Sequence, residues 1–401
     1  MSGEQLKILF LCSSEYGDIT SGQGVIITNT LRCLASMQGI NSAMGVFRPL
    51  LLFKANVLPD DPLHPLPPIN TLFHIMGTPY NKLKMLRGMV KLSSNDEMQY
   101  LQSVSKVSNT YDIALWFGSA CDPVSLKLPS YCNCPLLFHI NDSLFLYQQR
   151  QLTKRLRNLR IWVAERHERR VLASGYARVI YVSQEDYKAG IQLSARQHSA
   201  KIICLPNGVD IELFCPCPLL KSGPGKIVLL FAGTMFYEPN VDAALYLIKE
   251  IMPKIQSQVE LRIVGRDPTP AIIDAAKDDD RIVVTGTVCN MVPEYQAADI
   301  FIAPMISGSG IQNKILQALA CGLPVIATPM CVEAYTEKPA GILVGDNTDQ
   351  IVNMIERLMG NETERRELGH QGRMSIENKW SWEQRTEKLL KICRDVIDCK
   401  I

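Results

Sequence analysis

A small-residue turn followed by a lysine is the strongest chemical signal in this sequence. Residues 307–310 read Ser-Gly-Ser-Gly, and Lys314 follows at the start of an expected helix at 315–321. Small residues let a ligand approach the backbone, and the first N–H groups of a helix, with its dipole, attract phosphate. We predict a phosphate-binding turn made of Gly308, Ser309, Gly310, Ile311 and Lys314. The alternative is a tight turn in which the glycines serve only geometry. The spacing matches neither the P-loop nor the dinucleotide fingerprint.

Two further positions, in the N-terminal half, have residue types suited to a site. His139 lies at the end of an expected strand that begins at residue 135, and strand ends expose chemistry in parallel α/β folds. Gly22 and Gly24 lie in an expected turn after a strand at 7–12, where the backbone can approach a ligand. A structural histidine and a plain strand-to-helix turn are the alternatives.

Alternating strand and helix patterns must position these residues. In the N-terminal half we expect a helix at 25–37, a helical stretch at 147–174, and strands at 7–12, 113–117, 135–139 and 179–182. In the C-terminal half, helical segments separate most of the strands expected at 227–232, 259–264, 282–284, 300–303, 324–327 and 342–344. Further helical patterns occupy 363–378 and 382–398. This alternation predicts the α/β class, with parallel sheets covered by helices on both faces.

Proline-rich segments divide the chain. Residues 48–70 contain six prolines, which exclude helix and central strand and predict an irregular connection. Residues 216–225 hold three prolines and two glycines and mark the expected domain boundary. We therefore expect an N-terminal domain at 1–210, a C-terminal domain at 225–380 and a terminal helix within 381–401.

Composition argues against several functional classes. The 401 residues are 47% hydrophobic and carry a net charge of +2, which gives no support to a nucleic-acid-binding protein. We find no secretory signal and no run near the ~18 apolar residues of a spanning helix, so we expect a cytoplasmic protein. The 13 cysteines then indicate reduced thiols. Their close pairs, Cys132/Cys134 and Cys215/Cys217, lack zinc-site spacing, so we predict no metal.

One basic segment stands out from this neutral background. Residues 150–170 contain eight lysines and arginines but only two glutamates. A run of this kind on a helix is usually a solvated face. The other interpretation is peripheral contact with the inner face of a membrane, or with an anionic acceptor.

From about residue 233 to 346 the sequence resembles retaining glycosyltransferases of the GT-B fold, in family 4 (group 1). The matching segments, in order, are 233–234, 239–244, 263–266, 285–286, 298–299, 303–304, 308–310, 314–322 and 324–328. Residues 206–210, Pro-Asn-Gly-Val-Asp, are also typical of the family just before its second domain. The N-terminal half is similar through its first strand, Gly22, Gly24 and His139. The resemblance implies two Rossmann-like domains facing across a cleft, with the helix within 381–401 returning to the first domain.

The resemblance also implies roles for individual residues. The turn 308–314 would hold the donor diphosphate, with Gly233, Arg266 and the Gly22/Gly24 segment around it. Lys314 would stabilise the leaving group and His139 would face the reacting sugar, which makes these two the catalytic candidates. Gln317 would bind the ribose.

The sequence departs from the family pattern at four places. The two glutamates that the family carries eight positions apart are Ser309 and Gln317 here, and an arginine common in close relatives is Gln312. A basic pair after Gly233 is missing, because residues 234–248 contain no lysine or arginine.

By resemblance, the chain transfers a sugar, with retention of configuration, from a UDP- or GDP-sugar to a hydroxyl acceptor: a glycan, a lipid-linked acceptor or a small molecule. No metal or other cofactor is implied, and no nucleic acid. One alternative is a catalytically weak nucleotide-sugar-binding homologue that supports a partner transferase. The other is a nucleotide-sugar epimerase on the same fold.

Overall fold

The computed structural model describes residues 5–12, 22–37, 40–48, 70–76, 95–120, 122, 124–140, 142–150, 157–217, 227–308 and 310–399. The chain forms two compact units. The first comprises residues 1–206 and 385–401, and the second comprises residues 207–384. The predicted ranges were 1–210, 225–380 and 381–401. The second unit takes in residues 207–217, because Asn207 donates a hydrogen bond to Asn313 (3.0 Å) and Arg373 donates to the carbonyls of Ile211 and Phe214.

The first unit contains a seven-stranded sheet in the order β3-β2-β1-β4-β5-β6-β7, and every pairing in it is parallel. Its strands are β1 (Leu6–Cys12), β2 (Ile40–Arg48), β3 (Asn70–Met76), β4 (Ile113–Gly118), β5 (Leu136–Ile140), β6 (Arg178–Tyr181) and β7 (Ile202–Cys204). Its helices are α1 (Gly22–Ser36), α3 (Asn95–Val107), α4 (Leu144–Arg150), α5 (Arg157–Ala173), α6 (Gln184–Leu193), α7 (Arg196–Ser199) and most of α15 (Trp382–Asp398). Short 3₁₀ turns occupy Ser108–Thr110 and Leu128–Ser130.

The second unit contains a six-stranded parallel sheet in the order β10-β9-β8-β11-β12-β13. Its strands are β8 (Ile227–Ala232), β9 (Val259–Val264), β10 (Ile282–Gly286), β11 (Ile300–Ala303), β12 (Val325–Ala327) and β13 (Ile342–Val344). Its helices are α8 (Glu238–Tyr246), α9 (Pro270–Ala276), α10 (Val292–Ala297), α11 (Asn313–Ala320), α12 (Pro329–Glu333), α13 (Thr348–Gly360) and α14 (Glu362–Lys379). A π-helical turn (Leu247–Ile251) and a 3₁₀ turn (Met252–Lys254) extend α8.

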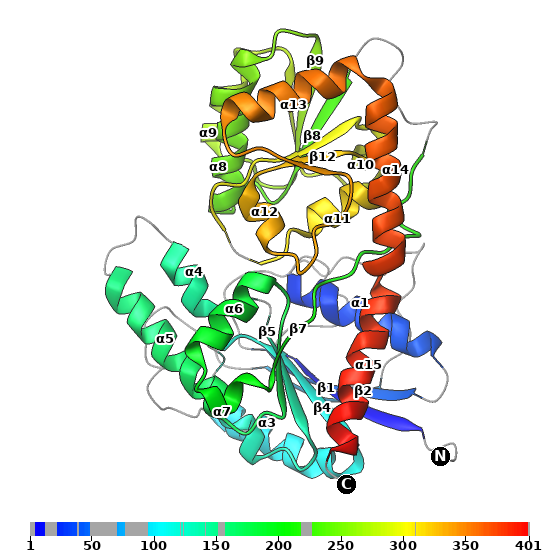
Figure 1. Ribbon diagram of the computed structural model, residues 1–401. Helices are drawn as coiled ribbons and strands as arrows, with labels where there is room; N and C mark the ends of the chain where they lie inside the picture. Colours follow the sequence, from blue (N-terminus) through cyan, green and yellow to red (C-terminus); the bar gives the residue numbers. More distant parts are fainter. Residues whose placement is uncertain are drawn as a thin grey trace. The chain divides into compact units, whose positions relative to one another are not determined.

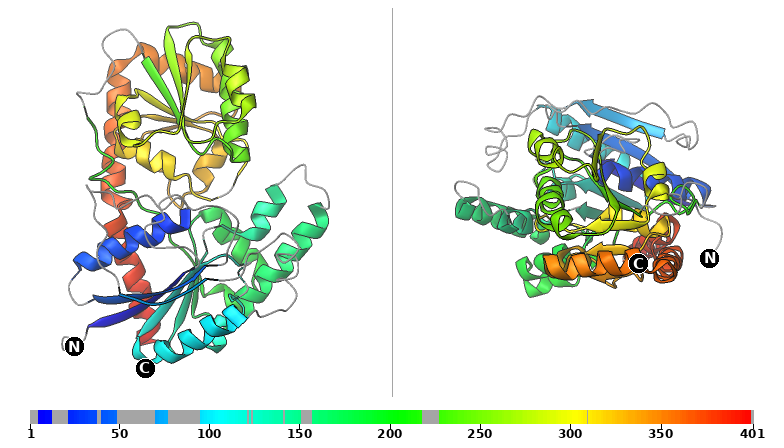
Figure 2. Two further views of the ribbon diagram at one scale, coloured as in Figure 1. Left: turned by 180° about the vertical axis from the view of Figure 1, so that it is seen from behind. Right: turned by 90° about the horizontal axis from the view of Figure 1, so that it is seen from above.

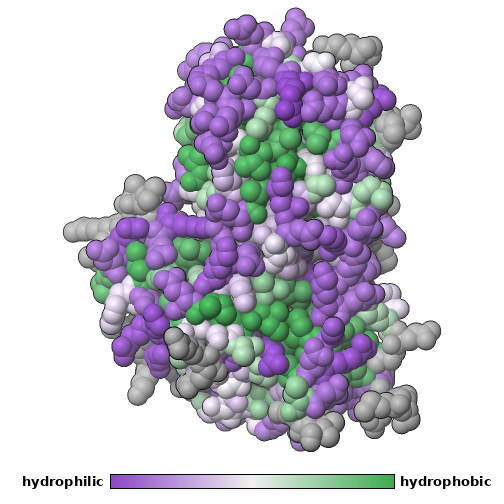
Figure 3. Space-filling model, in the orientation of Figure 1, coloured by the Kyte–Doolittle hydropathy of each residue, from purple (hydrophilic) through white to green (hydrophobic). Residues whose placement is uncertain are grey.

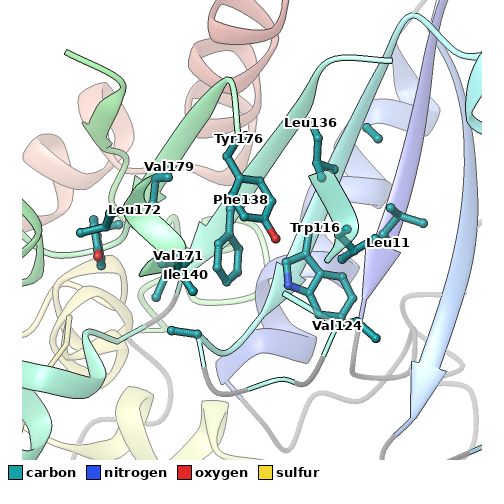
Figure 4. Close-up of a cluster of buried hydrophobic side chains, with 14 of the residues drawn as sticks. Leu11, Trp116, Val124, Leu136, Phe138, Ile140, Val171, Leu172, Tyr176 and Val179 are labelled. Carbon is teal, nitrogen blue, oxygen red and sulfur yellow. The ribbon is translucent and has the colours of Figure 1, made fainter. Parts of the chain in front are cut away.

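Helices cover both faces of each sheet (Figures 1 and 2), so each unit is a doubly wound α/β domain of the predicted class. The strands are apolar for this reason: every residue of β4 and of β11 is buried. In the first unit, Trp116, Phe138 and Tyr176 pack with aliphatic side chains on one face of the sheet (Figure 4).

Some predicted elements differ from the structure. β2, β3 and β7 are absent from the strands that the sequence predicts, and the helical stretch at 147–174 is two helices, α4 and α5. β2 escaped prediction because Asn41, Ser42 and Gly45 interrupt its apolar run. The irregular connection predicted at 48–70 lies outside the described residues, except that Arg48 ends β2 and Asn70 begins β3.

The surface face in Figure 3 is mostly hydrophilic, with separate hydrophobic areas among the polar side chains. Scattered apolar side chains are normal on a folded protein, so clusters are the informative cases. Two of the large exposed apolar side chains, Leu159 and Trp162, share helix α5. Two others, Phe236 and Tyr237, lie in the loop between β8 and α8.

Arg373 provides a test of how the second unit is held together. Its guanidinium donates to the carbonyls of Ile211, Phe214 and Ala320, so it joins the segment before β8, α11 and α14. Arg373→Met is expected to lower the free energy of unfolding by roughly 2–4 kcal/mol, because carbonyl groups lose charged donors. Urea denaturation followed by circular dichroism measures this. Arg366→Met is the matched control on α14, because the Arg366 side chain is 80% exposed and pairs only with Glu362; a change within about 0.5 kcal/mol is expected. Equal losses in the two variants would contradict the account.

Candidate functional site

The second sheet reverses its strand order between β8 and β11. From β8 the chain moves outward to β9 and β10, then crosses to β11 on the other side of β8 and continues to β12 and β13. In open parallel sheets, ligands bind beyond the carboxyl ends of the strands at this point. The residues that follow these two strands, 233–237 and 304–312, therefore define the candidate site.

The loops at this edge pack tightly because Gly265 has no side chain. Gly265 has φ +153°, and a Cβ there would lie 1.7 Å from the carbonyl oxygen of Gly233. Its N–H donates to the carbonyl of Gly286, and the N–H of Gly233 donates to that of Val264. The ends of β8, β9 and β10 are thus fixed against one another.

The turn after β11 relies on glycine conformations. Gly308 has φ +118° and Gly310 has φ +75°, values that side chains other than glycine rarely adopt. Ser307 Oγ donates to Asp242 Oδ2 at 3.0 Å, which ties the turn to α8. Ser309 lies outside the described residues. The turn predicted at 307–310 therefore lies beside the start of α8, at the carboxyl end of the central strands.

Helix α11 begins directly after this turn, at Asn313. Gln312 occupies the N-cap position and makes no side-chain cap hydrogen bond, and Ile311 before it is 9% exposed. The first backbone N–H groups of a helix have no intrahelical acceptor, and the helix dipole adds a partial positive charge there. This end of α11 therefore suits an anion such as a phosphate.

The Lys314 side chain is held by neighbouring groups of the second unit. Its Nζ donates to Asn240 Oδ1 at 2.7 Å, lies 3.6 Å from Met305 Sδ and sits 4.7 Å from the centroid of the Phe231 ring. Burial lowers the pKa of Lys314 to about 8, while the nearby Cys331 thiol acts in the opposite direction. The ammonium is therefore held at the switch point, where dehydration makes its charge costly and an anion would stabilise it.

Gln317 lies one turn further along α11. Tyr295 Oη on α10 donates to Gln317 Oε1 at 3.0 Å. Burial raises the pKa of Tyr295 far above neutrality, so the phenol keeps its proton and remains a donor. One of the two lone pairs of the Gln317 amide oxygen is thus used within the protein, and its amide N–H groups can donate to a ligand.

Arg266 follows β9 and is partly exposed. Its guanidinium carbon lies 5.5 Å from the centroid of the Phe236 ring, and its carbonyl accepts from the N–H of Met235. The side chain also lies near Asp267, with Nε 3.9 Å from Oδ2. Arg266 therefore contributes positive charge to the same edge of the sheet as Gly233.

Gly22 and Gly24 are not in a turn. They form the start of helix α1, which begins three residues earlier than the predicted 25–37. This helix follows β1, and β1 and β4 are the strands at which the first sheet reverses its order. The two glycines therefore lie at the switch point of the first unit, in a helix rather than a loop.

His139 is inside its strand, and the prediction that it lies at an exposed strand end is wrong. β5 runs to Ile140, and the His139 side chain is 0% exposed. Side chains alternate along a strand, so Phe138 and Ile140 enter the cluster of Figure 4 while His139 points to the other face. There its ring stacks on Phe117, with centroids 4.8 Å apart.

A buried arginine contacts this histidine. Arg385 on α15 is 3% exposed, with Nη2 2.6 Å from His139 Nε2 and Nη1 donating to Thr30 Oγ1 at 3.2 Å. A guanidinium only donates, so Nε2 accepts and the imidazole is neutral, with its proton on Nδ1. Burial lowers the pKa of Arg385 to about 9, which leaves it charged at neutral pH.

Arg385 is absent from the residues that the sequence predicts for the site, although its position carries a signal. Arg385 falls on the apolar face of α15 at helical spacing with Trp382, Leu389 and Cys393, which are all buried. A charged residue on such a face is unusual and indicates a buried partner.

The described residues of the basic segment 150–170 are Arg150, which ends α4, and residues 157–170 of α5. Arg157, Arg160, Arg166, Arg169 and Arg170 are exposed on α5. Trp162 is 54% exposed, and Arg166 lies over its ring at 5.7 Å from the centroid. The two glutamates of the segment are occupied elsewhere: Glu165 pairs with Arg169, and buried Glu168 accepts from Ser143, Phe145 and Tyr181.

Comparison with known proteins agrees with this geometry. Residues 226–361 match the family described as "Glycosyl transferases group 1". This segment is a group 1 glycosyltransferase domain. It contains the switch point, the glycine turn and Lys314.

Curated relatives match about half of this chain at modest identity. A GDP-mannose-dependent monoacylated alpha-(1-6)-phosphatidylinositol monomannoside mannosyltransferase of Corynebacterium glutamicum is 34% identical over 209 residues, which are 47% of this chain and 55% of the relative. A phosphatidyl-myo-inositol mannosyltransferase of Mycolicibacterium smegmatis is 27% identical over 204 residues, covering 48% and 51%. The chain thus spans about half the length of the curated relatives it matches.

Solved structures extend the likeness to nearly the whole chain. Sucrose-phosphate synthase from Thermosynechococcus elongatus has a TM-score of 0.71 at 19% identity, covering 98% of this chain and all of that one. Anabaena HepE in complex with UDP and glucose has a TM-score of 0.66 at 15% identity, covering 97% and 100%. With the two doubly wound sheets, these neighbours identify the GT-B fold of two Rossmann-like domains. In the described ranges, each helix is too short or too polar to traverse a lipid bilayer.

The contact between Arg385 and His139 can be tested directly. The neutral Nδ1–H form of His139 is expected at pH 7, because Arg385 donates to Nε2. Long-range ¹⁵N–¹H spectra of the imidazole groups measure the form, and His139→Gln assigns the signal among the six histidines. In Arg385→Met, His139 should no longer be held in the Nδ1–H form. In Arg394→Met, a substitution at an exposed position on the same helix, His139 should keep that form. An Nε2–H form or an imidazolium in the unmodified protein would contradict the contact.

Proposed function

We propose that this protein is a family 4 glycosyltransferase that transfers a sugar, with retention of configuration, from a nucleoside-diphosphate sugar to a hydroxyl acceptor. The observation that carries the proposal is the position of Lys314. Its ammonium and the first turn of α11 meet at the carboxyl ends of β8 and β11. A diphosphate is the anion whose size and charge suit this combination of backbone N–H groups, helix dipole and lysine.

The donor is a UDP- or GDP-sugar. The name of the Corynebacterium relative specifies GDP-mannose, and the Anabaena structure contains UDP. In our proposal Gly308, Gly310 and Ile311 line the diphosphate with Ser309, while Gly233 and Arg266 lie on its other side. Gln317 binds the ribose through its amide group, whose oxygen is oriented by the hydrogen bond from Tyr295.

The chemistry follows from where negative charge develops. As the bond between sugar and diphosphate breaks, charge accumulates on the leaving diphosphate. Donors placed in advance for that charge are typically the largest contribution to catalysis, about 10²–10³ in rate for one donor. In this proposal Lys314 and α11 provide the stabilisation without a metal ion. An oxygen of the donor phosphate accepts the acceptor's proton, and the acceptor hydroxyl attacks on the face that the diphosphate leaves.

The first unit supplies the acceptor side. Gly22 and Gly24 open α1 at the switch point of its sheet and let a ligand approach the backbone. His139 stays a candidate for contact with the reacting sugar. Because its ring is fully buried, the hydrogen bond to Arg385 must open before the ring can meet a ligand.

We further propose that the protein works at the cytoplasmic face of a membrane and contacts it through α5. Basic residues near an anionic bilayer contribute about 1 kcal/mol each, and tryptophan favours the interface. α5 exposes five arginines together with Trp162 and Leu159. The names of two relatives specify phosphatidylinositol acceptors, which supports a lipid-linked acceptor here.

A second candidate is a catalytically weak homologue that binds a nucleotide sugar and supports a partner transferase. Gln317 favours it, because an amide stands where the family carries a glutamate and its oxygen is engaged by Tyr295. Single-turnover assays with UDP- and GDP-sugars separate the candidates. Sugar transfer supports the transferase; donor binding without transfer or hydrolysis supports the binding homologue. A changed sugar formed from donor alone indicates an epimerase.

Lys314→Met tests the donor site. Loss of one charged hydrogen bond is expected to weaken UDP or GDP binding roughly 10- to 100-fold, measured by calorimetry. Lys277→Met, an exposed lysine after α9, is the control and should bind as before. In the unmodified protein, affinity should fall as pH rises above about 8, because the free protein then loses the Lys314 proton. Unchanged affinity in Lys314→Met would refute the phosphate role.

Removal of the apolar side chains of α5 tests the membrane contact. The double variant Leu159→Ala/Trp162→Ala should sediment several-fold less with phosphatidylglycerol vesicles than the unmodified protein, and neither protein should bind phosphatidylcholine vesicles strongly. Met374→Ala, which removes an exposed apolar side chain on α14, should bind as the unmodified protein does. Equal sedimentation of the double variant would contradict this surface.

A further inference from the structure

Asn240 contacts Lys314 and the turn after β8 at once. It lies in the first turn of α8 and is 7% exposed. Its Oδ1 accepts from Lys314 Nζ at 2.7 Å, and its Nδ2 donates to the carbonyl of Thr234 at 3.0 Å. The two hydrogen bonds fix both ends of the amide group, so its oxygen is held toward the ammonium.

Gly233 leaves room for this amide. A Cβ at position 233 would lie 2.7 Å from Asn240 Nδ2 and 2.9 Å from its Cγ, closer than side-chain carbons approach other atoms. A larger residue at the end of β8 would displace Asn240 and with it the acceptor of Lys314. Gly233 directly after β8, Asn240 on α8 and Lys314 on α11 therefore form one group of residues in mutual contact.

The ammonium is held by neutral groups. Besides Asn240, its neighbours are Met305 Sδ and the ring of Phe231. Asp242, two residues after Asn240, accepts instead from Ser307. Cys331 on α12 is the titratable neighbour, and burial raises the pKa of its thiol, which keeps it protonated. Within the described ranges, Lys314 forms no ion pair with a carboxylate.

A neutral acceptor and a carboxylate have different consequences at this position. Both would orient the ammonium, but a carboxylate would also cancel its charge. We propose that Asn240 is a positioning residue that aims the Lys314 ammonium while leaving its charge for an anionic ligand to balance. The inference rests on the proposed function for the identity of that ligand, a diphosphate.

Two substitutions separate positioning from charge. Asn240→Asp and Asn240→Leu are close in size to the original and both lose the hydrogen bond to Thr234. The aspartate alone adds a negative charge beside Lys314. Asn347→Asp, at the exposed N-cap of α13, is the control for the same chemical change elsewhere in the unit. Calorimetry with UDP, GDP and inorganic pyrophosphate measures binding at pH 7.

Affinity is expected to decrease in the order unmodified protein, Asn240→Leu, Asn240→Asp. The leucine variant should bind several-fold more weakly, because no side-chain oxygen at position 240 then orients the Lys314 ammonium. The aspartate variant should bind roughly 10- to 100-fold more weakly, because the charge is already balanced. Asn347→Asp should bind as the unmodified protein does. The proposal would be overturned if Asn240→Asp bound these anions as tightly as the unmodified protein. It would also be overturned if Asn240→Leu bound them with unchanged affinity.

A readout without ligand keeps this test independent of the proposed function. Proteins labelled with ¹³C at lysine Cε report the titration of Lys314, which Lys314→Met assigns. The titration midpoint should rise in Asn240→Asp and fall in Asn240→Leu, because a carboxylate favours the charged amine and leucine removes its acceptor. A midpoint that both substitutions leave unchanged refutes the positioning contact. An unmodified protein that shows the expected titrations but binds none of the three anions refutes the proposed function instead.

Discussion

A single half-buried ammonium group organises the second unit. Lys314 sits on the ring of Phe231 with Asn240 as its hydrogen-bond acceptor, and the two contacts come from the strand and the helix that begin the unit. A charge in such surroundings is costly unless it has a partner, and among the described residues its partners are neutral. The helix start beside it, the turn at 307–310 and the packing of Gly265 against Gly233 all lie at the same edge. In the proposed function, an anionic ligand balances this charge.

The first unit also contains a buried cation whose hydrogen-bond acceptors are uncharged. Its buried cation is Arg385, which enters from the far end of the chain and bonds to His139 and Thr30. Both acceptors are uncharged, as Asn240 is for Lys314. The guanidinium fixes the form of the imidazole, and stacking on Phe117 fixes its plane. The C-terminal helix therefore contributes buried hydrogen bonds to the first unit as well as packing.

The sequence predicts the elements best where a strand is buried on both faces. β8 and β11 have the predicted bounds because their apolar runs are continuous. β9 also has the predicted bounds, although Glu260 and Arg262 alternate with its buried apolar residues. It fails for β2, where polar residues break the run, and for His139, whose exposure depends on a helix more than 240 residues away. For the site, glycine spacing and Lys314 were sufficient to locate the edge. Asn240, Tyr295 and Arg385 were missed as partners, because no local pattern indicates which side chain folding brings opposite another.

The proposed function depends on a diphosphate binding where α11 begins. A crystal structure of the protein with UDP or GDP tests this most directly. We predict phosphate oxygens within hydrogen-bond distance of Lys314 Nζ and of backbone N–H groups between Gly310 and Lys314. A nucleotide bound with its phosphates away from this helix end, while Lys314 keeps Asn240 as its partner, would contradict the account.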